Sequence, residues 1–288
     1  MDTVELLKKV RKIEIKTRGL SNHIFSGEYH TAFKGRGMNF SEVREYQFGD
    51  DTRSIDWNVT ARFSHPFVKV FEEERELTVM LLVDVSESAL FGTSLQRKKD
   101  LITEICGVLA FSAINNNDKV GVIFFSGKVE KYIPAKKGRS HILRVIRELL
   151  SVRATQGGTN LAETLRYFNN VMKKRSIVFI LSDFICPDYK DALNIASKKH
   201  DVVGVHVFDL RDRELPAAGT IHMQDAETGR KGWVDSSDVR VRNFYARKFD
   251  EHLQYCRTAF VKSGADLVSI RTDQDYVKAL QAFFATRI

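Results

Sequence analysis

The sequence has few cysteines and no long apolar run. Its 288 residues include three cysteines, Cys106, Cys186 and Cys256, which lie far apart and show no Cys-x-x-Cys spacing. This argues against a disulfide framework and against a zinc site, and favours a reducing compartment. Residues 1–18 are rich in Lys and Arg, and no window reaches the apolar length of a membrane span. We therefore expect a cytoplasmic protein with no direct membrane insertion.

Several familiar catalytic and phosphate-binding motifs are also missing. The eight histidines show no metal-ligand spacing such as His-x-x-x-His. Neither Ser126 nor Ser182 lies in a nucleophile elbow. Gly35-Arg36-Gly37 lacks the P-loop pattern and favours a structural turn. Because neither a general base nor a catalytic triad is evident, we expect a protein that is not an enzyme.

The composition is that of a globular protein with a moderate basic excess. Hydrophobic residues make up 43% of the chain and charged residues 28%. The 45 Lys and Arg against 37 Asp and Glu give a net charge of +8, which is spread along the chain. Such a charge permits an acidic partner, nucleic acid or an anionic membrane, but selects none of them.

From residue 77 onward, short apolar runs alternate with longer amphipathic segments. This alternation predicts βαβ units and an α/β fold with a mostly parallel sheet flanked by helices. The predicted strands, two hairpins included, are residues 77–84, 119–125, 129–133, 176–182, 201–208, 220–223, 231–234 and 266–270. The predicted helices are residues 95–114, 140–150, 161–172, 189–199, 241–263 and 275–285.

The first 76 residues have a different pattern. Residues 3–15 predict a basic amphipathic helix, and the stretch that follows is rich in charge and aromatics. Residues 72–76 form a charge run, and no Pro- or Ser-rich linker separates the two parts. We therefore predict an N-terminal extension, residues 1–76, packed on a domain of residues 77–288.

Oxygen-bearing side chains follow two of the apolar runs. Asp84, Ser86 and Ser88 come after one predicted strand, and Asp183 comes after another. Thr159 lies between them on a glycine-rich turn. Ligands bind outside the carboxyl ends of parallel strands, and oxygen ligands suit Mg²⁺ or Mn²⁺. In the competing interpretation, the serines cap the next helix and Asp183 is an ordinary turn residue.

This order of residues resembles the metal-ion-dependent adhesion site (MIDAS) of von Willebrand factor A-like domains. The family pattern is Asp-x-Ser-x-Ser, then a distant Thr, then a distant Asp, and all five positions have a match. The resemblance implies a Rossmann-like domain that binds Mg²⁺ or Mn²⁺ through Asp84, Ser86, Ser88, Thr159 and Asp183. It also implies that the ion captures a carboxylate of another protein.

A second segment, residues 35–62, resembles the hallmark of domain-of-unknown-function family 58. It alternates acids, arginines and aromatics, which suits a rigid polar network. Members join such a segment to a von Willebrand factor A-like domain and are often associated with MoxR-type AAA+ ATPases. The resemblance implies a chaperone-like adaptor that serves such an ATPase in remodelling, maturation or assembly of a client complex. The client would supply the acidic side chain.

Two other classes of function stay open. A metal-dependent hydrolase, either a nuclease or a phosphatase, would use the same ion, although Asp84-x-Ser86 lacks the second carboxylate of an aspartate-nucleophile phosphatase. A nucleic-acid-binding module would use the basic helix of residues 3–15. We expect no nucleic acid, because that helix is better explained by docking of its apolar face with its lysines in water.

Overall fold

The computed structural model describes residues 10–11, 13–14, 16, 38–73, 77–93, 96–155, 157–225 and 229–287. Most of the predicted helix of residues 3–15, the Gly35-Arg36-Gly37 turn and residues 74–76 of the charge run lie outside these ranges. Two compact units are present: a small one within residues 33–77, and a larger one that contains residues 78–288.

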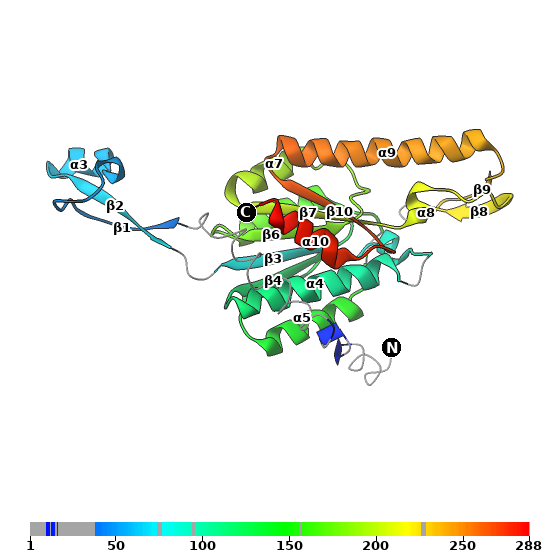
Figure 1. Ribbon diagram of the computed structural model, residues 1–288, viewed down its shortest axis with the longest axis horizontal. Coiled ribbons are helices and arrows are strands. Elements are labelled where there is room, and N and C mark those ends of the chain that lie inside the picture. Colours follow the sequence, from blue (N-terminus) through cyan, green and yellow to red (C-terminus); the bar gives the residue numbers. More distant parts are fainter. Residues whose placement is uncertain are drawn as a thin grey trace. The chain divides into compact units, whose positions relative to one another are not determined.

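The larger unit is built on a six-stranded sheet (Figure 1). Its strands are β3 (Thr78–Asp84), β4 (Lys119–Phe125), β5 (Val129–Lys136), β6 (Ile177–Ser182), β7 (Asp201–Phe208) and β10 (Asp266–Arg271). They lie in the order β10-β7-β6-β3-β4-β5, and only the β4–β5 pair is antiparallel. If these six strands are renumbered 1 to 6 along the chain, the order read from β5 to β10 is 3-2-1-4-5-6, which is that of doubly wound Rossmann sheets. The predicted α/β fold class is confirmed.

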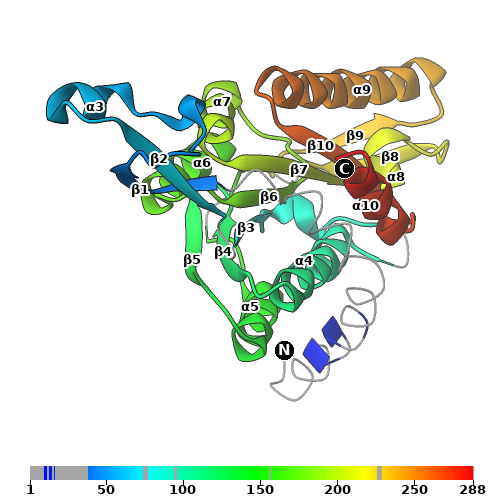
Figure 2. The same ribbon diagram turned by 60° about the vertical axis from the view of Figure 1, so that its left-hand side comes forward.

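Helices cover both faces of this sheet (Figure 1, Figure 2). One face carries α4 (Lys98–Asn115), α5 (Arg139–Ser151) and α10 (Tyr276–Ala285). The other carries α6 (Leu161–Val171), α7 (Lys190–Lys199) and α9 (Val239–Lys262). On the first face, Phe284 of α10 packs edge-to-face on Phe179 with ring centroids 6.4 Å apart. On the second, Phe168 and Phe260 join Met80 in one buried cluster.

The central strands are buried because they are covered on both faces. Residues 79–84 of β3 and all of β6 are buried, which explains why their sequences are continuous apolar runs. In β7, Gly204 permits close packing of α9, because a Cβ at this position would lie 2.6 Å from the Phe260 ring. The strand predicted over residues 129–133 is too short: β5 continues past Pro134 to Lys136 as an edge strand, where proline is tolerated.

A short helix and a hairpin are inserted between β7 and α9. They are α8 (Leu210–Arg213), β8 (Thr220–Gln224) and β9 (Lys231–Asp235). The predicted hairpin is confirmed. Asp209 caps α8 and also accepts hydrogen bonds from Thr93 Oγ1 at 2.6 Å and Thr272 Oγ1 at 2.8 Å. These bonds tie the start of the insertion to the loops at the carboxyl ends of β3 and β10.

The small unit is an antiparallel strand pair with two short helices. Its elements are β1 (Met38–Glu45), β2 (Phe67–Glu73), η1 (Thr52–Ser54) and α3 (Trp57–Phe63). Arg44 makes a bidentate pair with Asp50, at 2.7 and 2.8 Å, and Asp56 caps α3. These contacts are those of the predicted polar network. The predicted packing of the extension on the domain stays a prediction.

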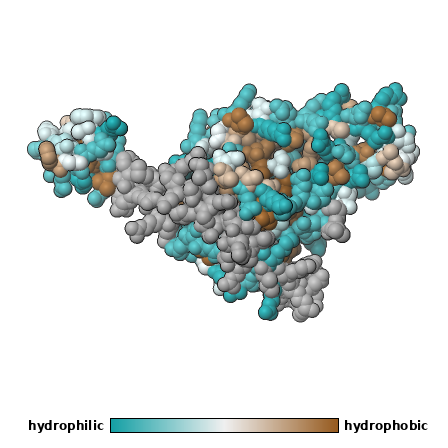
Figure 3. Space-filling view, viewed as in Figure 1, coloured by the Kyte–Doolittle hydropathy of each residue, from teal (hydrophilic) through white to brown (hydrophobic). Residues whose placement is uncertain are grey.

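Polar residues dominate the face of the larger unit seen in Figure 3, and hydrophobic residues gather around α10 and β10. None of the helices within the described ranges has the length and apolar character that a membrane crossing requires.

Candidate metal site

The two predicted carboxylates lie where the strand order of the sheet reverses. Asp84 is the last residue of β3, and Asp183 directly follows the neighbouring strand β6. The chain leaves these strands in opposite directions, so a crevice forms at their carboxyl ends, the usual ligand position in such sheets. Both side chains are buried, with Asp84 3% and Asp183 5% exposed.

Asp84 is held by neutral hydrogen-bond donors. Its Oδ1 accepts from the backbone N–H of Ser86 at 2.9 Å, and its Oδ2 accepts from the hydroxyl of Ser182 at 2.5 Å. Burial and then the negative charge of Asp183 raise the pKa of Asp84 to about 7. The sequence did not single out Ser182 as a partner of Asp84. Its position beside Asp183, at the end of an apolar run, was the available signal.

Ser86 and Ser88 present two buried hydroxyls beside Asp84. Their oxygens lie 3.0 Å apart, with Ser86 directly before η2 (Glu87–Leu90) and Ser88 within it. Ser86 occupies the N-cap position of η2 but makes no side-chain capping bond to it, and the N-cap position of α4 is occupied by Arg97. Ser88 also favours the charged form of Asp183 and so acts to lower the pKa of that carboxyl. The helix-capping interpretation of these serines is therefore wrong.

Asp183 is paired with a lysine that the sequence analysis missed. Nζ of Lys98 lies 3.0 Å from Oδ2 of Asp183 and 3.1 Å from Oδ2 of Asp212, and its side chain is only 2% exposed. Burial opposes ionisation of Asp183, yet the Lys98 ammonium holds the pKa of this carboxyl below its usual range. For Asp212 burial prevails, and its pKa is raised. A lysine at the start of an apolar helix matches no motif, so only the fold reveals this ion pair.

Thr159 is brought to the same edge of the sheet. It is buried, and the next residue, Asn160, donates its backbone N–H to the Ser126 carbonyl at 2.8 Å. Ser126 directly follows β4, the other neighbour of β3. All five predicted residues therefore lie at the carboxyl ends of β3, β4 and β6. Ser86 bonds Asp84 and Ser88, so those three form one connected group, and Asp84 also bonds Ser182, the residue before Asp183.

The donor set is one that a hard divalent cation can use. All five predicted ligands offer oxygen, which Mg²⁺ and Mn²⁺ favour. Nowhere in the described ranges do three or more His, Cys, Asp or Glu side chains form a metal-binding group, so the ion would depend on hydroxyls and water. When ionised, the carboxylates of Asp84, Asp183 and the partly buried Asp212 carry three negative charges, and the Lys98 ammonium, which pairs with Asp183 and Asp212, offsets one of them. One divalent cation would balance the other two.

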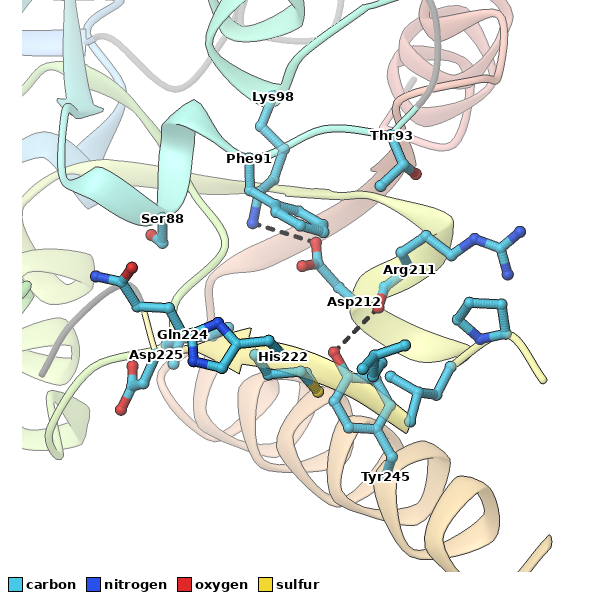
Figure 4. Close-up of a pocket in the computed structure, with 15 residues that line it drawn as sticks. Ser88, Phe91, Thr93, Lys98, Arg211, Asp212, His222, Gln224, Asp225 and Tyr245 are labelled. Atoms are coloured by element: carbon cyan, nitrogen blue, oxygen red, sulfur yellow. Dashed lines mark hydrogen bonds and ion pairs between the residues drawn. The ribbon is translucent and has the colours of Figure 1, made fainter. Parts of the chain in front are cut away.

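A cavity of about 530 Å³ opens beside Ser88. Its walls come from the loop after β3, from α8, from the β8–β9 hairpin and from α9. Figure 4 shows the Lys98–Asp212 pair near Phe91 on one side and His222 of β8 on the other. Much of the lining is apolar: Phe91, Ile185, Leu215, Pro216, Ile221 and Met223. The cavity therefore joins an apolar surface to the candidate metal site.

Residues 42–255 match a family described as "Protein of unknown function DUF58". The chain belongs to the DUF58 family. The predicted membership is thereby confirmed, and the matched range spans most of the small unit together with Asp84, Thr159 and Asp183.

Relatives of this DUF58 chain are found in bacteria. It is 31% identical over 290 residues to uncharacterized protein Rv1480 of Mycobacterium tuberculosis, with 100% of this chain and 91% of the relative covered. The match to uncharacterized protein Mb1516 of Mycobacterium bovis has the same values. Uncharacterized protein YeaD of Bacillus subtilis is 28% identical over 109 residues, which are 38% of this chain and 25% of YeaD.

Solved structures with some likeness to the DUF58 chain include BatB from Bacteroides thetaiotaomicron. That match has a TM-score of 0.47 and 18% identity, and covers 73% of this chain and 98% of BatB. The VWA domain of SpRpn10 matches with a TM-score of 0.40 and 10% identity, over 74% of this chain and 95% of that domain. The fold class stated above follows from the strand order of this chain itself.

Proposed function

We propose that this DUF58 protein is a metal-dependent protein-interaction adaptor. The observation that carries the proposal is the charge imbalance at the candidate site: the Lys98 ammonium pairs with Asp183 and the partly buried Asp212, and the buried carboxylate of Asp84 is held by neutral donors. Buried charge without a counter-ion is strongly unfavourable, so such a site takes up protons or a cation. The oxygen ligands favour Mg²⁺ or Mn²⁺ over softer metals.

Each residue of the site has a distinct task in this proposal. Asp84 is the anionic ligand, oriented by the Ser182 hydroxyl and the Ser86 N–H. Ser86 and Ser88 add neutral oxygens beside it, and Thr159 and Asp183 complete the site directly or through water. These ligands do not fill an octahedral shell, so the bound ion would keep water and could exchange one for a partner's carboxylate.

The cavity gives the partner a second point of contact. A protein segment that brings an acidic side chain to the ion passes the opening beside Ser88. A neighbouring apolar side chain of that segment could then enter between Phe91 and Ile221. Apolar burial would add affinity that the ion alone does not provide.

The partners in this proposal are an acidic client protein and a AAA+ ATPase of the MoxR type. The ATPase would carry out the nucleotide chemistry, and this chain would connect it to the client for remodelling, maturation or assembly. The proposal includes no catalysis by the chain itself and no nucleic acid. It is supported by DUF58 membership and by the donor set of the site.

The test combines metal binding with partner binding. Mn²⁺ binding is measured by electron paramagnetic resonance for the wild type, for Asp84→Ala and for Asp191→Ala, which removes an exposed carboxylate of α7. The purified MoxR-type ATPase of the same organism is then tested for binding in Mg²⁺ and in EDTA. We expect the wild type and Asp191→Ala to bind both ion and ATPase, and folded Asp84→Ala to bind neither.

Two results would contradict the adaptor function. Wild-type protein that takes up no Mn²⁺ would rule out the metal site. Metal-dependent turnover of a phosphate ester that is lost in Asp84→Ala would instead favour the hydrolase.

A further inference from the structure

Lys98 is a buried lysine at the edge of the candidate metal site. It is the first residue of α4, and its backbone N–H donates to the Phe91 carbonyl at 3.1 Å. Its Nζ lies between the carboxylates of Asp183 and Asp212, 5.6 Å from the centroid of the Phe91 ring. An ammonium so deeply buried is tolerated only where anions surround it. This fold holds a fixed positive charge against one of its own predicted metal ligands.

The two carboxylates predicted to share a metal ion are therefore not equivalent. Oxygens of Asp84 accept from neutral donors, which include the N–H of Ser86 and the hydroxyl of Ser182. Oδ2 of Asp183 is occupied by the Lys98 ammonium, and its Oδ1 accepts from the Ile185 N–H at 3.2 Å. A divalent cation that approaches Asp84 meets a carboxylate held by neutral donors. At Asp183 it meets a carboxylate that is already paired with the Lys98 ammonium.

We propose that Lys98 is a tethered cation that competes with the divalent ion for Asp183 and so sets the metal affinity of the site. This inference rests on the proposed metal function. Like charges in a poorly solvated site repel strongly, so the ammonium weakens ion binding. Asp212 provides the ammonium with a second anion at 3.1 Å, which lets Nζ give up Asp183 without losing every partner. Lys98 thus favours a weakly held, exchangeable ion over a permanent structural one.

The experiment measures the Mn²⁺ dissociation constant by electron paramagnetic resonance for four variants and the wild type. Lys98→Met removes the ammonium and keeps a similar length, and Lys98→Arg keeps the charge. Lys99→Met is the matched control, because its amine bonds the Val152 carbonyl at 2.9 Å and contacts no carboxylate of the site. Lys98→Met/Asp212→Asn removes the ammonium together with one carboxylate, in case Lys98→Met does not fold.

We expect Lys98→Met and the double variant to bind Mn²⁺ about tenfold more tightly than the wild type, or better. Lys98→Arg and Lys99→Met should stay near the wild-type value. Thermal unfolding should show a second effect. In EDTA Lys98→Met should melt below the wild type, because Asp183 and the partly buried Asp212 lose their counter-ion. Saturating Mn²⁺ should raise its Tm more than that of the wild type.

Distinct results would overturn the inference and the function on which it rests. Unchanged or weaker Mn²⁺ binding by the Lys98 variants, with normal binding by the wild type, would refute the role of Lys98 alone. Absence of Mn²⁺ binding by the wild type and by every variant would refute the metal site itself, and with it the competition.

Discussion

The hydroxyl of Ser182 donates to Oδ2 of Asp84 at 2.5 Å and joins the ends of two adjacent strands. Ser182 is the last residue of β6, and Asp84 the last residue of β3. The same hydroxyl oxygen accepts from the N–H of Phe184, which fixes the start of the loop that carries Asp183. One serine thus orients the carboxylate of one loop and the backbone of the next.

Ser182→Ala should destabilise the protein and weaken metal binding. The change leaves a buried carboxylate oxygen and the Phe184 N–H without their partner, at a cost of about 1–3 kcal/mol of unfolding free energy. Urea unfolding in EDTA measures this loss, and Mn²⁺ titration measures the affinity. Ser151→Ala, at an exposed position in the last turn of α5, should change neither quantity. Wild-type stability in Ser182→Ala would show that the hydroxyl does not support Asp84.

Without metal, the stability that Asp84 contributes should fall as the pH rises from about 4 to 7, and the difference in unfolding free energy between the wild type and Asp84→Asn isolates it. The lowered pKa values of His200 and His206 act on the total stability in the opposite direction. The pKa of Asp84 lies at about 7 in the folded protein, above its ordinary value of 3.8, so the folded state keeps a proton that the unfolded state releases. The stabilising proton is fully present below pH 3.8 and is lost as the pH passes 7. Mg²⁺ should replace the proton and reduce this fall, and Asp84→Asn should abolish it. Urea unfolding across this pH range, in EDTA and in Mg²⁺, is the measurement.

Blocking the cavity should separate partner binding from metal binding. Ile221→Arg places a charged side chain in the apolar lining, whereas Thr220→Arg adds the same group to an exposed neighbour outside that lining. We expect Ile221→Arg to lose the acidic partner and to keep wild-type Mn²⁺ affinity, and Thr220→Arg to keep both. Equal partner binding by the two variants would show that the partner does not use the cavity.

Gly204→Ala should destabilise the larger unit. The added Cβ would lie 2.6 Å from the Phe260 ring, so β7 and α9 would have to move apart at a cost of about 1–3 kcal/mol. Gly232→Ala in β9 is the matched control, because its Cβ would meet no heavy atom within 4 Å. Thermal unfolding compares the two variants. Similar Tm values for both would mean that the packing of α9 adjusts without cost.

Much of the fold was predictable because it depends on local pattern. The buried strands β3 and β6 read as continuous apolar runs, and helices such as α6 show apolar residues at helical spacing. Boundaries were less certain: the helix predicted to start at residue 95 begins at Lys98, and the one predicted from residue 241 begins at Val239. Such ends depend on capping contacts, which apolar periodicity does not encode.

The sequence by itself determined the α/β class, membership of DUF58 and the order in which the oxygen ligands occur. It could do so because strand periodicity, motif order and a charged-aromatic segment are properties of the chain as written. Only the tertiary structure decided which charges meet. Lys98 lies 85 positions before Asp183 and 114 before Asp212, yet its ammonium contacts both carboxylates. Burial and these contacts together shift the pKa values of Asp183 and Asp212, because nearby charges interact more strongly with a group that is removed from water.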